Sequence, residues 1–281
     1  MKIVVLEADA VGDVSYDILS EFGELKTYDH TPNHLVAERI QDADIVVPNK
    51  CILDEMTMKD AKALKLVCEA ATGYNNIDTD YCKERGIAVT NVGDYSTEAV
   101  VQHTFALLLS LCAHLDHYAG YVEDGSYSKG ESFTCMDRTF FELHGKVFGV
   151  FGLGHIGRRV AEVANALGMQ VVYFSASGRD YDVPYKRLEW DDFLSSCDVV
   201  SCHAPLNEAT RGKMDSYAFS KMKKTAIFLN LGRGAIVNEK DLVDALKKGE
   251  IMACGLDVYE VIPAPTSVIH PLDYENEDPA E

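Results

Sequence analysis

Positive charge is scarce in this 281-residue sequence. It has 26 Lys and Arg against 45 Asp and Glu, which gives a net charge of −19 at pH 7. A chain so acidic repels the phosphates of nucleic acids and anionic lipids, which argues against partners of either kind. The sequence also lacks an apolar run long enough to cross a bilayer and an N-terminal secretion signal. We therefore expect a cytoplasmic protein that binds neither nucleic acid nor membrane.

Cysteine pairs with metal-ligand or redox spacing are also missing. None of the eight cysteines forms a C-x-x-C pair, and several lie in apolar runs such as "LKLVCEA" and "DVVSCHAP". Reduced, packed thiols are therefore expected in place of disulfides or a zinc site, and we predict no metal.

Short apolar runs alternate with helix patterns over the first ninety residues. Runs begin near Lys2, Gly23, Ala43, Leu64 and Gly86. Amphipathic helix patterns fill the gaps, as at Val14 to Glu21 and Asp78 to Arg85. This rhythm predicts a parallel sheet covered by helices on both faces.

A long helix and a second strand-helix series follow. The stretch from Ser96 to Val122 has helical apolar spacing over more than twenty residues, which indicates a buried or interface helix. From Lys146 apolar runs and helix patterns alternate again, up to "MACGLDVY". We predict an α/β fold of two doubly wound parallel-sheet domains, residues 1–97 and 98–265, before an acidic, solvated tail at 266–281.

The strongest local signal is "KVFGVFGLGHIGRR". Gly152, Gly154 and Gly157 fit G-x-G-x-x-G directly after a buried strand and at the start of a helix. The first glycine permits a tight turn, the second lets the backbone approach a diphosphate, and the third lets helix and strand pack closely. The amides near His155 and Ile156 would then face the phosphate charge, which predicts dinucleotide binding.

The end of the next strand bears on the choice of cofactor. An NAD site usually has an acid there, whereas "VVYFSASGRD" supplies Ser175, Ser177 and Arg179, with Asp180 coming late. Hydroxyls and a guanidinium suit a 2′-phosphate, so NAD(P)(H) is expected with a lean towards NADP(H). The alternative is that Arg179 is a solvated loop residue and the site accepts either cofactor.

Several longer motifs occur together and in order: "GLGHIGRR", "HAPLNEATRG", "LNLGRGAIVNEKDLVDALKKGEI" and "CGLDVYE", preceded by "AATGYNNID" and "NVGDYSTEAVVQHT". With them the sequence resembles the D-isomer-specific 2-hydroxyacid dehydrogenases, most closely the hydroxypyruvate reductase and glycerate dehydrogenase branch. The resemblance covers residues 1 to about 265.

This resemblance implies a flavodoxin-like substrate domain followed by a Rossmann cofactor domain, with hinge segments near Tyr95 to Glu98. Arg233 would clamp the 2-oxoacid carboxylate and carbonyl, a partner that suits its planar guanidinium. Further substrate contacts would come from Lys50 and the backbone of Thr72, Gly73 and Tyr74. The cofactor contacts that it implies are Thr97, His203, Pro205, Thr210 and Asp257. The loop "YSKGESFTCMDRTFFELHG" matches the family's dimer arm, which implies a homodimer.

Structural roles remain open for three of these residues. Arg233 could pair with a nearby acid, Asp257 could cap a turn, and His203 could be a buried histidine satisfied by backbone.

The C-terminal part departs from the family pattern. The family has an acid before the proline that follows the "DVY" strand, where this sequence has Ile262, and Glu260 stands two residues early, about 6 to 7 Å along a strand. No Pro-His segment supplies the catalytic histidine, and His270 resembles a non-catalytic His-Pro-Leu instead. Loss of a general acid lowers the rate by about 10² to 10⁴.

Three hypotheses follow from this pattern. The first is a working or residual NAD(P)H-dependent reductase of small 2-oxoacids such as hydroxypyruvate or glyoxylate, with Glu260, His270 or a partner chain completing the site. The second is a catalytically dead NAD(P)-binding module that senses redox state or pairs with an intact relative. The third is that the terminus reflects a frameshift.

Overall fold

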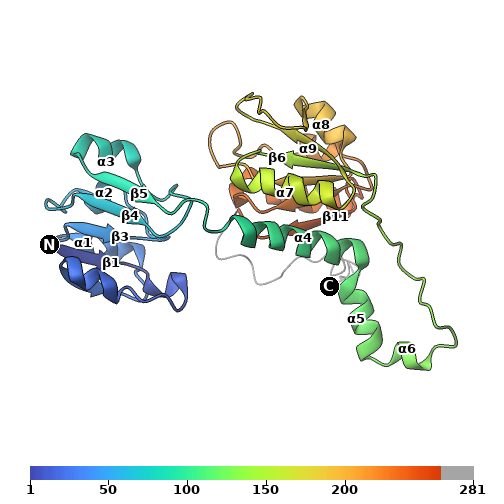
Figure 1. The fold of residues 1–281 in the computed structure, drawn as a ribbon, viewed down its shortest axis with the longest axis horizontal. Helices are drawn as coiled ribbons and strands as arrows, with labels where there is room; N and C mark the ends of the chain where they lie inside the picture. The colour runs from blue at the N-terminus through green and yellow to red at the C-terminus, as the bar shows by residue number, and fades with distance from the viewer. Residues whose placement is uncertain (261–281) are drawn as a thin grey trace, which may run out of the picture. The chain divides into compact units, whose positions relative to one another are not determined.

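The structure is a computed structural model that describes residues 1–260. The chain divides into two compact units, Met1–Ser96 and a second that begins at Thr97. Each unit is built on its own parallel sheet (Figure 1). These two doubly wound α/β sheets confirm the predicted fold class.

The first unit contains a five-stranded sheet in the order β2-β1-β3-β4-β5, in which every pair is parallel. This order is that of the flavodoxin-like fold. The strands are β1 (Lys2–Val5), β2 (Glu24–Thr27), β3 (Ile45–Val47), β4 (Leu66–Glu69) and β5 (Ala88–Asn91). The helices are η1 (Ala8–Val11), η2 (Asp17–Phe22), η3 (Asn33–Leu35), α1 (Val36–Ile40), α2 (Glu55–Met58) and α3 (Thr79–Arg85).

One predicted helix of this unit is wrong. Of the pattern at Val14 to Glu21, only the part from Asp17 onward is helical, as the 3₁₀ helix η2, which has no buried residue and leaves Ile18 65% exposed. The chain has to leave the helical path soon afterwards, because Gly23 crosses the end of β1. A Cβ added at Gly23 would lie 2.2 Å from the Met1 carbonyl oxygen. A full amphipathic helix therefore does not form between β1 and β2.

The second unit contains a six-stranded parallel sheet in the order β11-β10-β9-β6-β7-β8. With β6 counted as the first strand, this is the 3-2-1-4-5-6 order of the Rossmann fold read from the other edge. The strands are β6 (Val147–Phe151), β7 (Gln170–Phe174), β8 (Lys186–Arg187), β9 (Val199–Cys202), β10 (Ile227–Asn230) and β11 (Ala253–Leu256). The two-residue edge strand β8 is too short to give an apolar run, and the sequence did not predict it.

Helices cover both faces of this sheet. Residues of α4 and α7 pack with Phe148, Val150 and Ile227 on one face, whereas α8, α9 and α10 pack with Phe151 and Phe228 on the other. These two apolar layers explain why the central strands β9 and β10 are buried along their whole length. The helices are α4 (Thr97–Ala113), α5 (Leu115–Glu123), α6 (Ser126–Lys129), α7 (His155–Ala166), α8 (Trp190–Ser196), α9 (Ser216–Lys221), η4 (Gly234–Ile236) and α10 (Glu239–Lys247).

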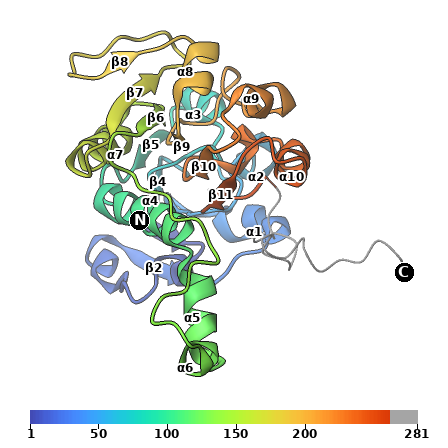
Figure 2. The ribbon, with the colours of Figure 1, turned by 90° about the vertical axis from the view of Figure 1, so that its right-hand side faces the viewer.

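The predicted long helix is broken. His114 adopts a left-handed conformation with φ of 50°, and α4 and α5 meet at a bend of 61°. The buried side of α4, with Val101, Phe105 and Leu108, packs on the sheet, whereas α5 has no buried residue. Together with α6, α5 projects away from the sheet of this unit in both views (Figures 1 and 2). Within residues 1–260, no single helix is long and apolar enough to span a membrane. The bent pair α4–α5 together reaches the required length and apolar composition.

Candidate functional site

The glycine turn joins β6 to α7, and packing accounts for two of its three glycines. Gly152 has φ of 95°, and a Cβ there would lie 2.6 Å from the Cα of Ala204. A Cβ on Gly157 would lie 2.1 Å from the carbonyl oxygen of Gly152. At Gly154 an added Cβ would meet nothing within 4 Å. The open side of the turn at Gly154 is therefore the place where a ligand could approach the backbone.

The first turn of α7 lacks a side-chain cap. Gly154 is its N-cap and offers no side chain, whereas α9 and α10 are capped by Asp215 and Asn238. The amides of His155 and Ile156, which the sequence assigned to a diphosphate, belong to this uncapped turn. A helix start of this kind favours an anion, so the residues present fit a dinucleotide.

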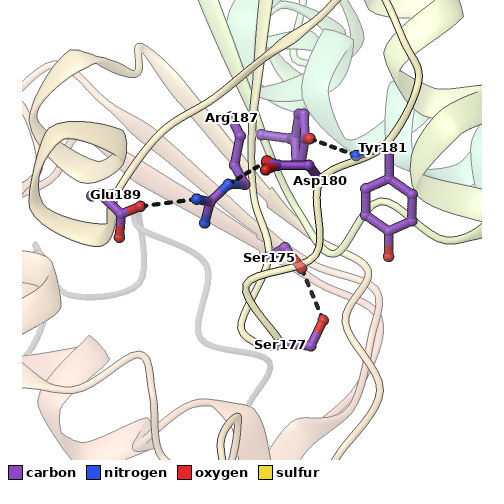
Figure 3. A network of polar contacts seen from close by, with 7 residues as sticks. Ser175, Ser177, Asp180, Tyr181, Arg187 and Glu189 are labelled. Atoms are coloured by element: carbon purple, nitrogen blue, oxygen red, sulfur yellow. Dashed lines mark hydrogen bonds and ion pairs between the residues drawn. The ribbon is translucent and has the colours of Figure 1, made fainter.

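The loop after β7 contains a small polar network (Figure 3). Ser175 is buried and its hydroxyl is 3.1 Å from that of Ser177. The late acid, Asp180, forms an ion pair of 2.6 Å with Arg187, and Arg187 also contacts Glu189 at 3.2 Å. Asp180 is therefore already engaged, and hydroxyls occupy the position where an NAD site usually has an acid.

Two arginines lie beside Tyr181 in the same loop region. The guanidinium carbons of Arg158 and Arg179 are each 5.0 Å from the centroid of the Tyr181 ring. Among residues 1–260 neither arginine forms an ion pair with an acid. Arg179 is exposed, but it rests on this ring. The sequence reasoning missed Arg158, although its position directly after Gly157 could have drawn attention to it.

His203 follows β9, close to the glycine turn. A hydrogen bond of 2.8 Å joins its Nε2 to the Ser201 hydroxyl, so a hydroxyl is its partner and not the backbone. Its buried Nδ1 has no hydrogen-bond partner within the described chain. Burial lowers the pKa of His203 to about 3, so the imidazole is neutral at physiological pH.

The loop after His203 is held by Thr210. This residue is buried, its hydroxyl donates to the Pro205 carbonyl oxygen at 2.7 Å, and it accepts from the Asn207 amide at 2.9 Å. Pro205 itself is exposed. Thr210 therefore shapes the predicted cofactor loop from inside.

Arg233 and Asp257 follow the neighbouring strands β10 and β11. The Arg233 guanidinium donates to the Gly232 carbonyl oxygen at 2.9 Å, and no acid of residues 1–260 pairs with it. The Asp257 amide donates to the Asn230 carbonyl oxygen, and its Oδ1 lies 3.4 Å from Nε2 of His103 on α4. No role for His103 was expected from the sequence, since its partner is distant along the chain.

The loop after β10 packs directly on the segment after β11. A Cβ added at Gly234 would lie 1.7 Å from the Tyr259 carbonyl oxygen. Glu260 is held nearby: its carboxylate accepts from the Glu239 amide at 3.2 Å, and its own amide donates to the Glu239 carboxylate. Ile262 and His270 lie outside the described residues.

The predicted substrate residues follow β3 and β4 in the first unit. Lys50 and Tyr74 are exposed, and the Thr72 hydroxyl donates to the Val92 carbonyl oxygen at 2.9 Å. Gly73 is half-buried between them. Thr97 is half-buried at the start of α4 in the second unit.

The cysteines and the other possible metal ligands lie in both units. All eight cysteines are free thiols. Over the described part of the chain, no group of three or more His, Cys, Asp or Glu residues is arranged to hold a metal ion.

Comparison with known proteins agrees with this architecture. The family model for the D-isomer specific 2-hydroxyacid dehydrogenase, NAD binding domain, matches residues 105–276. A hydroxypyruvate reductase of Blautia hydrogenotrophica is 37% identical over 274 residues, which cover 94% of this chain and 84% of that protein.

Two solved structures extend the comparison to the fold. The TT0316 protein of Thermus thermophilus is 32% identical with a TM-score of 0.85, over 98% of this chain and 86% of its own. An NADPH-dependent glyoxylate/hydroxypyruvate reductase of Sinorhizobium meliloti, solved with NADP and malonate, is 25% identical with a TM-score of 0.83, over 96% and 83%.

The Rossmann sheet and its glycine turn define a dinucleotide-binding α/β protein of the oxidoreductase class. The chain belongs to the D-isomer-specific 2-hydroxyacid dehydrogenases, an NAD-dependent enzyme family, and its relatives include those of the hydroxypyruvate reductase and glycerate dehydrogenase branch.

Proposed function

We propose that this chain is an NAD(P)H-dependent reductase that converts small 2-oxoacids, such as hydroxypyruvate or glyoxylate, to D-2-hydroxyacids. The observation that carries the proposal is the turn at Gly152 to Gly157, in which Gly152 and Gly157 are closely packed and Gly154 is open. The amides of His155 and Ile156 would hold the diphosphate there. When bound, the nicotinamide supplies the hydride.

The substrate contacts that the sequence predicts are proposed for this chain as well. Arg233 has no acidic partner among residues 1–260, so its guanidinium is available for two parallel hydrogen bonds to a planar 2-oxoacid. Lys50 and the backbone of Thr72, Gly73 and Tyr74 would bind the substrate carboxylate. Asp257, whose Oδ1 lies 3.4 Å from Nε2 of His103, would accept from the carboxamide of the cofactor.

The cofactor preference would be for NADP(H). Arg158 and Arg179 lie beside Tyr181 and pair with no acid of the described residues, and Asp180 is engaged by Arg187. A 2′-phosphate brings about two negative charges to such a place, whereas NADH brings none. The predicted contacts of Ser175 and Ser177 would add one hydroxyl donor, because one of the two hydroxyls donates to the other. Of the solved relatives, the Sinorhizobium meliloti enzyme was obtained with NADP.

A second candidate is a catalytically silent member of the family that binds NAD(P)(H) and senses redox state. One observation favours it: the Glu260 carboxylate, which would have to replace the acid missing at Ile262, is bound at the first amide of α10. A carboxylate held there is not free to orient a histidine. On this reading turnover is lower by about 10² to 10⁴.

Two measurements on one sample separate the candidates. NADH and NADPH are titrated first, by quenching of the single tryptophan or by calorimetry, and a panel of short 2-oxoacids is then tested for hydride transfer. The reductase is supported by turnover with hydroxypyruvate or glyoxylate. Cofactor binding without turnover in either direction would leave only the sensor. An empty cofactor site would overturn both.

The assembly would be a homodimer that uses the arm of α5, α6 and the loop behind them. Phe133, Met136 and Phe140 are 88%, 86% and 68% exposed on this arm. Exposed apolar residues gathered on a projecting segment are typical of a protein interface. A cytoplasmic location is also proposed, because eight free thiols suit a reducing compartment.

A further inference from the structure

Two buried acids lie at the carboxyl ends of β1 and β4 in the first unit. The Glu7 carboxylate accepts hydrogen bonds from three consecutive amides after β3, those of Asn49 at 2.9 Å, Lys50 at 2.7 Å and Cys51 at 2.9 Å. Burial on its own would raise the pKa of Glu7, but these amides lower it below the usual range. Glu7 is therefore a fixed anion that holds the loop carrying Lys50.

Glu69, the last residue of β4, is the second acid and is only 1% exposed. Its Oε2 accepts from the Asn76 side chain at 3.0 Å, and the same amide group donates to the Cys51 carbonyl oxygen at 3.0 Å. Asn76 thus links the loop after β4 to the loop after β3. The other oxygen of Glu69, Oε1, is buried without a hydrogen-bond partner in the described chain. A buried acid in this state favours its neutral form.

The pKa of Glu69 depends on its burial and on the charged and polar groups around it. Burial raises the pKa of Glu69 to about 7, and the negative charge of Glu7 acts in the same direction. The hydrogen bond from Asn76 and the positive charge of Lys50 act against it. Cys51, the remaining titratable neighbour, stays a neutral thiol because burial raises its pKa to about 12. Glu69 therefore changes charge within the physiological range, under the influence of the positive charge of Lys50.

We propose that Glu69 is a positioning residue that couples the two substrate loops, and that its proton decides how fully Lys50 is available to an anionic substrate. This inference rests on the proposed function, in which Lys50 and Thr72 to Tyr74 hold the substrate carboxylate. When Glu69 is ionised it attracts the Lys50 ammonium and repels the incoming carboxylate. When Glu69 is protonated, Lys50 serves the substrate alone. Substrate affinity therefore falls as Glu69 loses its proton, and by reciprocity a bound anion raises the pKa of Glu69.

The first experiment needs no substrate. The full-length protein labelled with ¹³C at glutamate carboxyl carbons is titrated by NMR from pH 5 to 9, and the Glu69 signal is assigned by its loss in Glu69→Gln. We expect a midpoint near neutrality. In Lys50→Met the midpoint should move upward, because the cation that favours the ionised form is gone. A Glu69 signal that does not titrate between pH 6 and 8.5 would overturn the proposal.

The second experiment measures binding of oxalate, an unreactive planar anion of constant charge over this range, to the protein saturated with NADP⁺. We expect its Kd to rise about tenfold from pH 6 to 8.5 in the wild type and to stay level in Glu69→Gln. The matched control is Glu84→Gln, which removes an exposed acid on α3 and should keep the wild-type dependence. Equal pH dependence in the wild type and Glu69→Gln would refute the coupling.

The two experiments fail in different ways. If oxalate binds to none of these proteins while Glu69 still titrates near neutrality, the proposed function fails and the substrate coupling fails with it. If oxalate binds but Glu69 does not titrate, the proposed function stands and Glu69 has no part in it. Urea unfolding followed by far-UV circular dichroism shows that each variant is folded.

Discussion

Replacement of Glu69 by Gln should change how the stability of the first unit depends on pH. The folded protein keeps the Glu69 proton up to a pKa of about 7, whereas the ordinary value is 4.5. Between these values the native state binds more protons than the unfolded state, so the free energy of unfolding falls as pH rises. The difference corresponds to ~3 kcal/mol, lost between pH 4.5 and about 7 and constant above.

In Glu69→Gln this slope should disappear, because the amide does not titrate. The absolute stability is a poorer measure, since a buried amide group without a partner itself destabilises by about 1 to 3 kcal/mol. The depressed pKa of Glu7 gives the opposite slope, but only below its ordinary value of 4.5. The window from pH 5 to 8 therefore isolates Glu69.

The assay is urea unfolding at pH 5, 6, 7 and 8, followed by far-UV circular dichroism and by fluorescence of Trp190. The tryptophan lies in the second unit and reports the transition of that unit. There the lowered pKa of His203 predicts the reverse trend, since its neutral form is the native one and stability is lost as pH falls below 6.5. A wild-type transition of the first unit that is as stable at pH 8 as at pH 5, or a Glu69→Gln variant with the wild-type slope, would refute the reasoning.

Three further outcomes test the second unit. Gly157→Ala should lose NAD(P)H binding and be less stable by about 1 to 3 kcal/mol, because its Cβ would lie 2.1 Å from the Gly152 carbonyl oxygen. Gly154→Ala should lose binding but keep its melting temperature. Equal stability of the two variants would contradict this prediction. Burial raises the pKa of Cys202 to about 12, so about one thiol in 10⁴ is ionised at pH 8 and iodoacetamide should modify it only after urea unfolding, as mass spectrometry of the peptide would show. Phe133→Ser should shift the protein towards monomer in light scattering, and an unchanged mass would argue against the arm as the interface.

The sheets could be predicted from the sequence because their central strands are buried. Predominantly apolar runs such as those of β6 and β9 are recognisable as strands, and parallel pairing follows from the helices between them. The helix predicted near Trp190 to Ser196 is α8 with the same bounds. It could be predicted because its buried residues, Phe193 and Leu194, follow Trp190 at helical spacing. Local pattern and tertiary structure agree in these elements.

The remaining features depend on contacts between distant residues. The break at His114 arises because α4 packs on the sheet and α5 does not, and no residue type marks that change in the sequence. The pair of Asp180 and Arg187 depends on the short strand β8, which brings the chain back beside the end of β7. His103 meets Asp257 only because α4 crosses β11.

The contact between Gly234 and the Tyr259 carbonyl has a practical consequence for protein engineering. The backbones of the two loops are in direct contact at this point. A chimera that exchanged only one of the loops between homologues would bring the two backbones into steric clash. A redesign that aims to shift the guanidinium of Arg233, or to graft a new segment beyond Tyr259, would therefore need to replace both loops together.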